Sequence, residues 1–390
     1  MVAALRVSAG CLFLKTVVKG GKMGHPLSIL IKPASGRCSM RCSYCFYRDE
    51  QGRRQDADRG MMDEGILGLI LEKAFAEGEG RISVAFQGGE PTLRGISFFE
   101  HAFHVAAEMN VRNVPIQWSF QTNGLALDHA WCELFRSNGV LVGLSVDGTR
   151  AMHDQFRKDA SGEGTYERTV RAAGLLAENG VSFNILTVVT HALAGQAQEV
   201  YRSYRRHGWM WQQYIPCLDG LGAEAGVSFP WHLGEEEYAE FLCGLFDCWR
   251  DDLLEGHAPH IRQLDNWMGI LLGHAPEACD MRGACSVQYA FEADGSCYPC
   301  DFYMLDSFCL GNIEETGFAG FDGQRRQMGF IERSAALPRR CLRCRYASLC
   351  RGGCIRARGP EGLFVHCDAM QLFFGRKLPE MLALRDRLLL

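Results

Sequence analysis

The sequence predicts an α/β protein built on a parallel sheet, followed by a cysteine-rich region. Six short apolar runs alternate with longer amphipathic stretches, a pattern typical of strands that alternate with helices. The predicted strands cover residues 27–31, 82–86, 116–120, 140–146, 183–189 and 210–215. The predicted helices between them cover residues 62–77, 96–109, 128–137, 166–179 and 194–207. This order implies right-handed crossovers, and it fits both an open six-stranded barrel and a doubly wound sheet.

Composition and charge narrow the class of protein. The 390 residues are 47% hydrophobic and 22% charged, with a net charge of −5, which predicts a globular chain of two or three domains. The chain has no excess of basic residues, so nucleic-acid binding is not expected. No apolar run is long enough to predict a membrane span. Residues 1–22 lack a convincing secretion signal, so we expect a disordered N-terminal extension and a cytoplasmic protein. Eighteen cysteines in close clusters indicate metal binding rather than disulfides.

Three cysteines stand together directly after the first predicted strand. Cys38, Cys42 and Cys45 form the pattern C-x3-C-x2-C. Four thiolates close a [4Fe–4S] cluster, so three from one loop leave one iron open to a small molecule. Structural zinc is the alternative, but it needs four ligands, and the nearest histidine is His25. The spacing therefore favours an open iron–sulfur cluster over structural zinc.

Glycines and polar residues follow the next three predicted strands. Residues 87–92 read Q-G-G-E-P-T, residues 121–124 read Q-T-N-G, and residues 145–148 read S-V-D-G. Each segment alone would be ordinary turn chemistry. Because the carboxyl ends of parallel strands meet at one edge of a sheet, the segments and the cysteine loop predict a single site.

Eight further cysteines lie in the last third of the chain, at Cys279, Cys285, Cys300, Cys341, Cys344, Cys350, Cys354 and Cys367. Helices predicted at 235–254 and 261–272 lead into this region. The count suits two [4Fe–4S] clusters or a zinc ribbon with two four-cysteine sites. Residues 288–298 predict a hairpin that turns at Asp294-Gly295. Cys297 and Cys300 face opposite sides of its returning strand, which argues against Cys297 as a ligand.

These motifs resemble a known superfamily. C-x3-C-x2-C followed by an aromatic residue is similar to the signature of radical S-adenosylmethionine (SAM) enzymes. The spacing C-x9-G-x4-C, then C-x2-C-x5-C-x3-C and a last cysteine, resembles their SPASM extension. F-Q-G-G-E-P-T-L, Y-P-C-D-F-Y-M and L-C-R-G-G-C-x-R resemble the anaerobic sulfatase-maturating enzymes. The resemblance implies a partial (β/α)6 barrel at 23–233, a helical linker at 234–278, a SPASM domain at 279–367 and a C-terminal helix at 368–390.

The resemblance also implies the cofactors, which are SAM and three [4Fe–4S] clusters. Cys38, Cys42 and Cys45 would hold the cluster that binds SAM. One auxiliary cluster would take Cys279, Cys285, Cys300 and Cys354, and the other Cys341, Cys344, Cys350 and Cys367. SAM would contact Tyr44, Gly88, Gly89, Glu90, Ser145, Arg157 and Leu218. An Arg157 guanidinium can grip a carboxylate with two hydrogen bonds, but Arg157 would equally fit a surface pair with Asp154 or Asp159.

The implied reaction oxidises a sulfatase cysteine, in some members a serine, to Cα-formylglycine after a 5′-deoxyadenosyl radical removes hydrogen from Cβ. Asp301 would be the base, and Tyr47 and Gln87 would orient the peptide. The expected partners are a sulfatase with a C/S-x-P-x-R motif and an electron donor such as flavodoxin or ferredoxin, and the chain is expected to be a monomer. The alternatives are a SPASM peptide maturase that forms thioether or carbon–carbon links, and a non-catalytic iron–sulfur or zinc scaffold.

Overall fold

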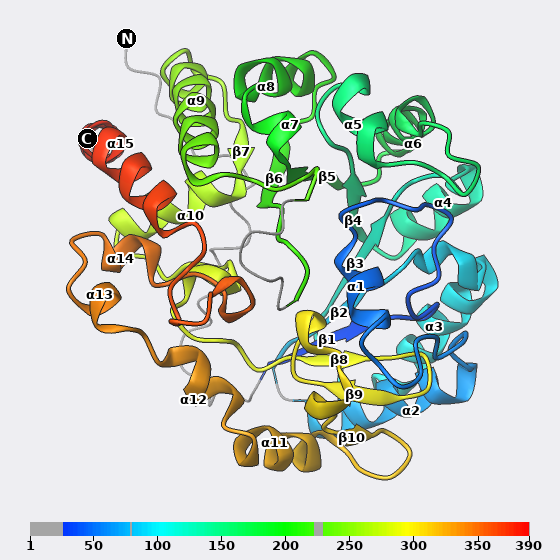
Figure 1. Cartoon of the computed structure of the whole chain (residues 1–390). Helices are drawn as coiled ribbons and strands as arrows, with labels where there is room; N and C mark the ends of the chain where they lie inside the picture. The colour runs from blue at the N-terminus through cyan, green and yellow to red at the C-terminus, as the bar shows by residue number, and fades with distance from the viewer. Residues whose placement is uncertain (1–25, 79, 222–228, 390) are drawn as a thin grey trace.

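The computed structural model describes residues 26–78, 80–221 and 229–389, so the predicted extension at 1–22 lies outside the described residues. The described strands form one sheet in the order β10-β9-β8-β1-β2-β3-β4-β5-β6-β7 (Figure 1). The strands are β1 Leu27–Ile31, β2 Ile82–Phe86, β3 Ile116–Thr122, β4 Leu141–Ser145, β5 Phe183–Val189, β6 Trp211–Pro216, β7 His260–Ile261, β8 Tyr289–Phe291, β9 Ser296–Tyr298 and β10 Gly311–Asn312.

The helices lie mostly around the outside of this sheet, although α1 is drawn inside the ring (Figure 1). They are α1 Phe46–Gln51, α2 Glu64–Glu77, α3 Ile96–Met109, α4 His129–Ser137, α5 Arg150–Phe156, α6 Tyr166–Glu178, α7 His191–Ala194, α8 Ala197–Arg206, α9 Glu235–Leu254, α10 Arg262–Leu271, α11 Phe318–Gln327, α12 Phe330–Ala335, α13 Arg339–Leu342, α14 Ala347–Cys350 and α15 Cys367–Leu388. The long helices α9 and α15 pack against each other. Among the described residues, no helix is both long and apolar enough to cross a membrane.

The sheet is open and singly wound. Strands β1 to β7 follow one another in chain order, and each pairs in parallel with the next. In a doubly wound sheet the strand order would reverse partway across the sheet, so the partial barrel is the correct fold. The cysteine-rich region extends the same sheet, because β8 pairs in parallel with β1 and then with β9 in an antiparallel hairpin.

The alternation of apolar residues explains why these segments are strands. Ile82, Val84 and Phe86 of β2 are buried, and the residues between them are half-buried, as expected for a strand whose side chains alternate between two faces. The aromatic rings of Phe86 and Phe99 meet edge to face at 5.0 Å, as do those of Phe99 and Phe120. Burial of each such side chain contributes about 1.5–3 kcal/mol. This core fixes the strand ends on which the site is built.

All six predicted strands are present, within two residues at each end. The five predicted helices are also present, as are those predicted at 235–254 and 261–272 and the hairpin predicted at 288–298. The sequence did not indicate the short strand β7 or the short helices α1, α5 and α7. Gln121 and Thr122, expected after the third strand, are the last residues of β3.

Candidate active site

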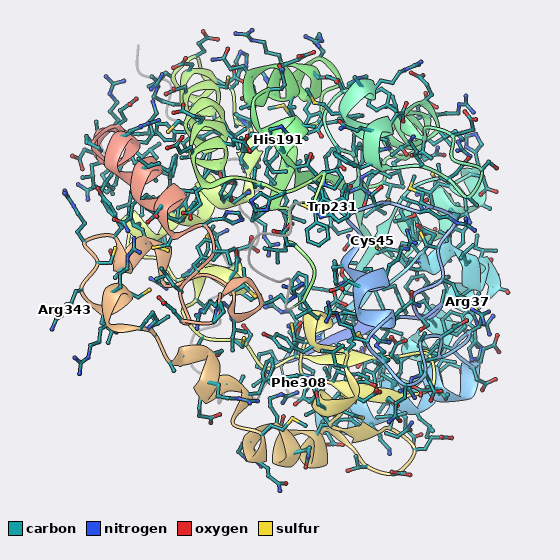
Figure 2. The ribbon with its side chains drawn as sticks, in the orientation of Figure 1. Arg37, Cys45, His191, Trp231, Phe308 and Arg343 are labelled. Carbon is teal, nitrogen blue, oxygen red and sulfur yellow. The ribbon has the colours of Figure 1, made fainter. Side chains whose placement is uncertain are left out.

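The three-cysteine loop runs between β1 and α1. Cys45 directly precedes α1 and is drawn beside that helix in Figure 2. Burial, then the charge of Glu90 and those of the neighbouring thiols Cys42 and Cys45, together raise the pKa of Cys38 to about 12. Cysteine binds metals as the thiolate, and three thiolates supplied by one short loop need a bound cation to offset their charge. The donor set therefore fits a metal cluster.

The two glycines after β2 are required by a close approach within the protein itself. A Cβ atom on Gly89 would lie 2.0 Å from the carbonyl oxygen of Arg37, and Gly88 has a φ of +117°. The amide of Gly89 donates to the carbonyl of Ser35 at 3.0 Å, and that of Glu90 donates to the carbonyl of Arg37 at 2.8 Å. This junction therefore fixes the backbone that leads into Cys38.

Glu90 connects the ends of β2 and β3. Its Oε1 accepts hydrogen bonds from the hydroxyls of Thr92 and Thr122, both at 2.8 Å, and from the amide of Thr92 at 3.2 Å. Its Oε2 accepts from the amide of Asn123 at 2.8 Å. The carboxylate is buried, and both of its oxygens are occupied by protein donors. Its side chain therefore orders the site from within the protein.

Asp147, which follows β4, holds a second group of buried side chains. Its carboxylate accepts from Nε and Nη2 of Arg157 at 2.8 and 3.1 Å, and from the amide of Val188 at 2.9 Å. The hydroxyl of Tyr44 donates to it as well. Asp147 and Arg157 are both buried. Asp147 was missed as a site residue, although it belongs to the S-V-D-G segment after β4.

The surface pairs that the sequence suggested for Arg157 are wrong. Asp154 accepts instead from the amide of Tyr166, and Asp159 pairs with Arg168. Arg157 is buried, and its guanidinium donates two hydrogen bonds to the carboxylate of Asp147. Two other predicted site residues lie at the ends of strands. Ser145 is the last residue of β4 and is buried, and Leu218 follows β6 and is half-buried.

Three predicted residues meet at the carboxylate of Asp301. Its Oδ2 accepts from the hydroxyl of Tyr47 at 2.8 Å and from Nε2 of Gln87 at 2.7 Å. Gln87 Nε2 also donates to the Tyr47 hydroxyl at 3.0 Å. The Oδ1 of Asp301 is buried without a hydrogen-bond partner in the described structure. Burial raises the pKa of this carboxyl, so the arrangement presents one free basic oxygen.

A buried group of charges that the sequence did not reveal lies next to Asp301. Lys32 donates to Oε1 of Glu292 at 2.8 Å, and Arg54 donates to the same oxygen. Within the described structure, neither carboxylate oxygen of Glu50 has a hydrogen-bond partner. Burial, reinforced by the charge of Asp301, raises the pKa of Glu50 to about 8. Lys32 and Glu292 lie 260 residues apart, so no local pattern in the sequence links them.

The eight later cysteines fall into two sets. Burial raises the pKa of Cys300, and the thiols of Cys354 and Cys279 add to the effect. Cys279 and Cys285 act on Cys354 in the same way, again after burial. The second set is Cys341, Cys344, Cys350 and Cys367, whose thiols likewise add to the effect of burial on Cys350. Cys297 belongs to neither set and is fully buried in the hydrophobic core.

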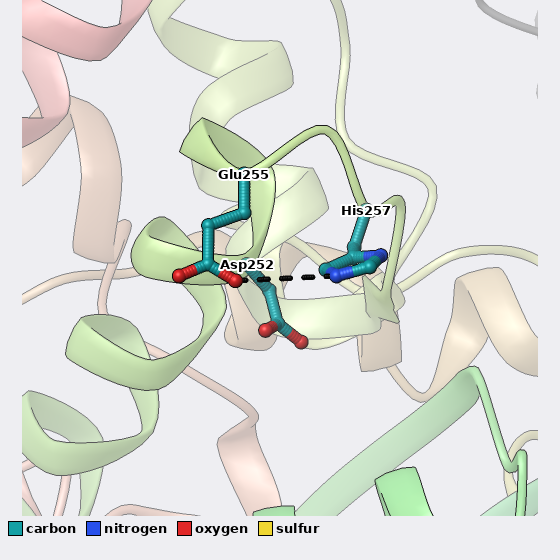
Figure 3. Close-up of side chains that lie close together, drawn as sticks. All are labelled: Asp252, Glu255 and His257. Atoms are coloured by element: carbon teal, nitrogen blue, oxygen red, sulfur yellow. Dashed lines mark ion pairs between the residues drawn. The ribbon is translucent and has the colours of Figure 1, made fainter.

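One further cluster of possible metal ligands has a simpler explanation. Asp252, Glu255 and His257 lie close together at the end of α9 (Figure 3). Asp252 already accepts from the Tyr201 hydroxyl and pairs with Arg205 at 2.6 Å. Glu255 and His257 are exposed. We treat the group as a surface ion-pair network.

Sequence comparison places the chain among known enzymes. Residues 33–201 match the family model of the Radical SAM superfamily. The chain is 38% identical over 362 residues to a cysteine-type anaerobic sulfatase-maturating enzyme of Clostridium novyi (strain NT), covering 91% of this chain and 96% of that protein. The Clostridium perfringens (strain 13 / Type A) enzyme of the same type is 37% identical, with 92% and 98% covered. A serine-type enzyme of Klebsiella aerogenes is 30% identical, with 90% and 84% covered.

Structure comparison agrees. The solved structure of native anSMEcpe with bound AdoMet and Cp18Cys peptide has a TM-score of 0.88 at 37% identity, covering 93% of this chain and 99% of that chain. Streptococcus suis SuiB bound to S-adenosylmethionine has a TM-score of 0.60 at 16% identity, covering 87% and 76%, and shares the fold alone. A non-catalytic scaffold is thereby excluded. The chain belongs to the anaerobic sulfatase-maturating enzymes, a family of the radical SAM superfamily.

Proposed function

We propose that this protein oxidises a cysteine of a sulfatase to Cα-formylglycine, with SAM as co-substrate. Two cysteine-type enzymes match at 37–38% identity, whereas a serine-type enzyme matches at 30%. The difference favours cysteine over serine as the residue oxidised. The substrate segment is expected to carry a C-x-P-x-R motif.

The observation that carries the proposal is the geometry at Asp301. Two side chains, Tyr47 and Gln87, hold Oδ2, and Oδ1 remains a buried acceptor without a partner. A general base must offer a lone pair within hydrogen-bond reach of the proton that it removes. Asp301 would take the thiol proton of the substrate cysteine at Oδ1, while Tyr47 and Gln87 keep the carboxylate in place.

The loop of Cys38, Cys42 and Cys45 would hold a [4Fe–4S] cluster. With SAM bound, this cluster would supply the one-electron chemistry that removes a hydrogen atom from Cβ of the substrate. Tyr44, Gly88, Gly89, Glu90, Ser145, Arg157 and Leu218 would form the SAM site. Because Asp147 occupies Nε and Nη2 of Arg157, the contact proposed for Arg157 is through Nη1.

The two later cysteine sets would each hold one auxiliary [4Fe–4S] cluster. Their members affect one another's pKa within each set, which supports this division. An electron carrier such as flavodoxin or ferredoxin would serve the enzyme. We further propose that the protein is a cytoplasmic monomer, and that the boundaries at residues 233, 278 and 367 separate its domains.

The test is anaerobic incubation of the reconstituted protein with SAM, a reductant and a peptide carrying C-x-P-x-R. We expect formylglycine in the peptide by mass spectrometry and deoxyadenosine in solution. A matched peptide with serine in place of cysteine should react more slowly. Deoxyadenosine without any change in either peptide would contradict the proposed substrate, and a thioether or carbon–carbon link would indicate a peptide maturase.

A further inference from the structure

The segment from Arg333 to Arg358 has a charge opposite to that of the whole chain. It contains eight arginines and no lysine, aspartate or glutamate, whereas the protein has a net charge of −5. Arg339, Arg343 and Arg345 are exposed, and Arg343 extends outward from the edge of the molecule near α13 (Figure 2). An isolated surface of this kind attracts a negatively charged partner.

Three exposed arginines of this segment lack the carboxylate partner that several other exposed arginines of the protein have. Arg136, Arg150 and Arg376 each pair with a carboxylate. Over the described residues, the only ion pair in the 333–358 segment joins Arg340 to Asp368. Arg339, Arg343 and Arg345 therefore keep their full charge for an outside partner. Leu342 lies between them and is 69% exposed, which gives the patch an apolar centre.

The patch flanks two members of the second cysteine set, Cys341 and Cys344. Cys341 and Cys344 alternate with these arginines along the chain, and both are only partly buried. Under the proposed function this set holds an auxiliary [4Fe–4S] cluster, so a partner seated on the patch would lie beside a redox centre. We infer that Arg339, Leu342, Arg343 and Arg345 form the docking surface for a small acidic electron-carrier protein.

The alternatives fit the charge less well. A C-x-P-x-R substrate segment carries an arginine of its own, so the patch repels it. An anionic lipid surface would fit the charge, but stable binding to a lipid surface also takes a broad apolar face or a lipid chain, and the apolar side chain of this patch is that of Leu342. Charged groups at the rim of an interface act mainly on the association rate and its salt dependence. The docking should therefore weaken steeply as salt is raised.

The test measures binding of oxidised flavodoxin, an acidic flavoprotein, to the reconstituted protein by calorimetry at low and moderate salt. The variant is the triple charge reversal Arg339→Glu, Arg343→Glu and Arg345→Glu. The control is Arg171→Glu, Arg202→Glu and Arg206→Glu, which changes the net charge equally on α6 and α8. All six arginines are exposed and have no carboxylate partner in the described structure. Iron content and circular dichroism confirm that both variants are folded.

We expect the patch variant to bind flavodoxin about tenfold or more weakly and with a shallower salt dependence, since three surface charges each contribute up to about 1 kcal/mol. The control should bind within about twofold of the parent. Equal weakening in both variants, or none in the patch variant, would overturn the inference. So would a patch variant that loses binding to phosphatidylserine vesicles but still binds flavodoxin. Dithionite-driven SAM cleavage, which needs no docking, reports separately on the proposed function.

Discussion

The buried carboxylates on the two sides of the active site differ in their hydrogen bonding. On the side of the glycine-rich junction and β4, Glu90 and Asp147 have both carboxylate oxygens occupied by protein donors. On the side of α1, Oδ1 of Asp301 and both oxygens of Glu50 are buried without hydrogen-bond partners in the described structure. The two sides are held by the same sheet, so the difference lies in the side chains and not in the fold.

Buried polar groups are nearly always hydrogen-bonded, and an unpartnered one is costly. A side whose acceptors are all occupied is rigid and suits the holding of a cofactor in one place. A side with open acceptors retains capacity for a proton or a hydrogen bond from outside. Mutations on the first side should therefore lower stability and iron content more than the rate of the chemical step. Mutations of Asp301 should lower the rate of the chemical step and leave stability nearly unchanged.

The largest effect on the rigid side should come from Gly89→Ala. Its Cβ would lie 2.0 Å from the backbone oxygen of Arg37, so the loop that carries Cys38 must move. We expect loss of the iron held by that loop and of SAM cleavage altogether, measured by iron content and deoxyadenosine formation. Gly68→Ala on α2, where a new Cβ meets nothing within 4 Å, is the control and should behave as the parent.

Asp301→Asn should have the next largest effect, on chemistry alone. Asn keeps the shape and a partner for Tyr47 but loses basicity, and a general base typically contributes about 10²–10⁴ in rate. Formylglycine formation should fall by that order, while iron content, SAM binding and the unfolding midpoint stay near the parent's. Asp306→Asn, in the next turn of chain, should have little effect. Substrate oxidation at the parental rate would show that Asp301 is not the base.

Asp147→Asn should act in the opposite way. It leaves the buried guanidinium of Arg157 without its counter-charge, a change that typically costs about 3–5 kcal/mol. We expect the free energy of unfolding to fall by that order in chemical denaturation of the reconstituted protein. Glu167→Gln breaks the exposed pair with Arg150 and should cost less than about 1 kcal/mol. Equal stability losses in the two variants would show that the buried pair with Arg157 contributes no more to stability than the exposed pair does.

Local patterns were sufficient for much of this molecule. Alternating apolar residues located β2 within its observed bounds, and the spacing of Cys38, Cys42 and Cys45 indicated the loop at the heart of the site. The meeting of Tyr47, Gln87 and Asp301 was expected from the resemblance to a known family. Each of these signals is contained in a short stretch of chain or in a family motif.

Pairings between distant segments could not be predicted in the same way. The pair of Lys32 with Glu292 depends on the parallel pairing of β8 with β1. No turn motif or periodicity in the sequence indicates that pairing. Asp154 and Asp159 both lie nearer to Arg157 in sequence than Asp147 does, and only the fold shows that these two bind other partners. The open oxygens of Glu50 are likewise a property of tertiary packing.

The smallest effect should come from Glu50→Gln, and it should depend on pH. Burial, with a contribution from the charge of Asp301, raises the pKa of Glu50 from 4.5 to about 8, against the opposing charges of Lys32, Arg54 and Arg356. Between these values the folded protein binds more protons than the unfolded chain, so the contribution of Glu50 to stability falls as pH rises. The loss is complete above pH 8. A neutral glutamine removes this titration, and the variant should exceed the parent at pH 8.5 by about 1–3 kcal/mol, because at that pH the parent keeps a buried charge that glutamine lacks. The two proteins should converge toward pH 5.

Denaturation midpoints measured across this range would check the prediction, and Glu332→Gln, on the surface, should show no such pH dependence. A glutamine variant that is less stable than the parent at pH 8.5 would mean that Glu50 is held by charge after all, and the contrast between the two sides of the site would then be confined to Asp301.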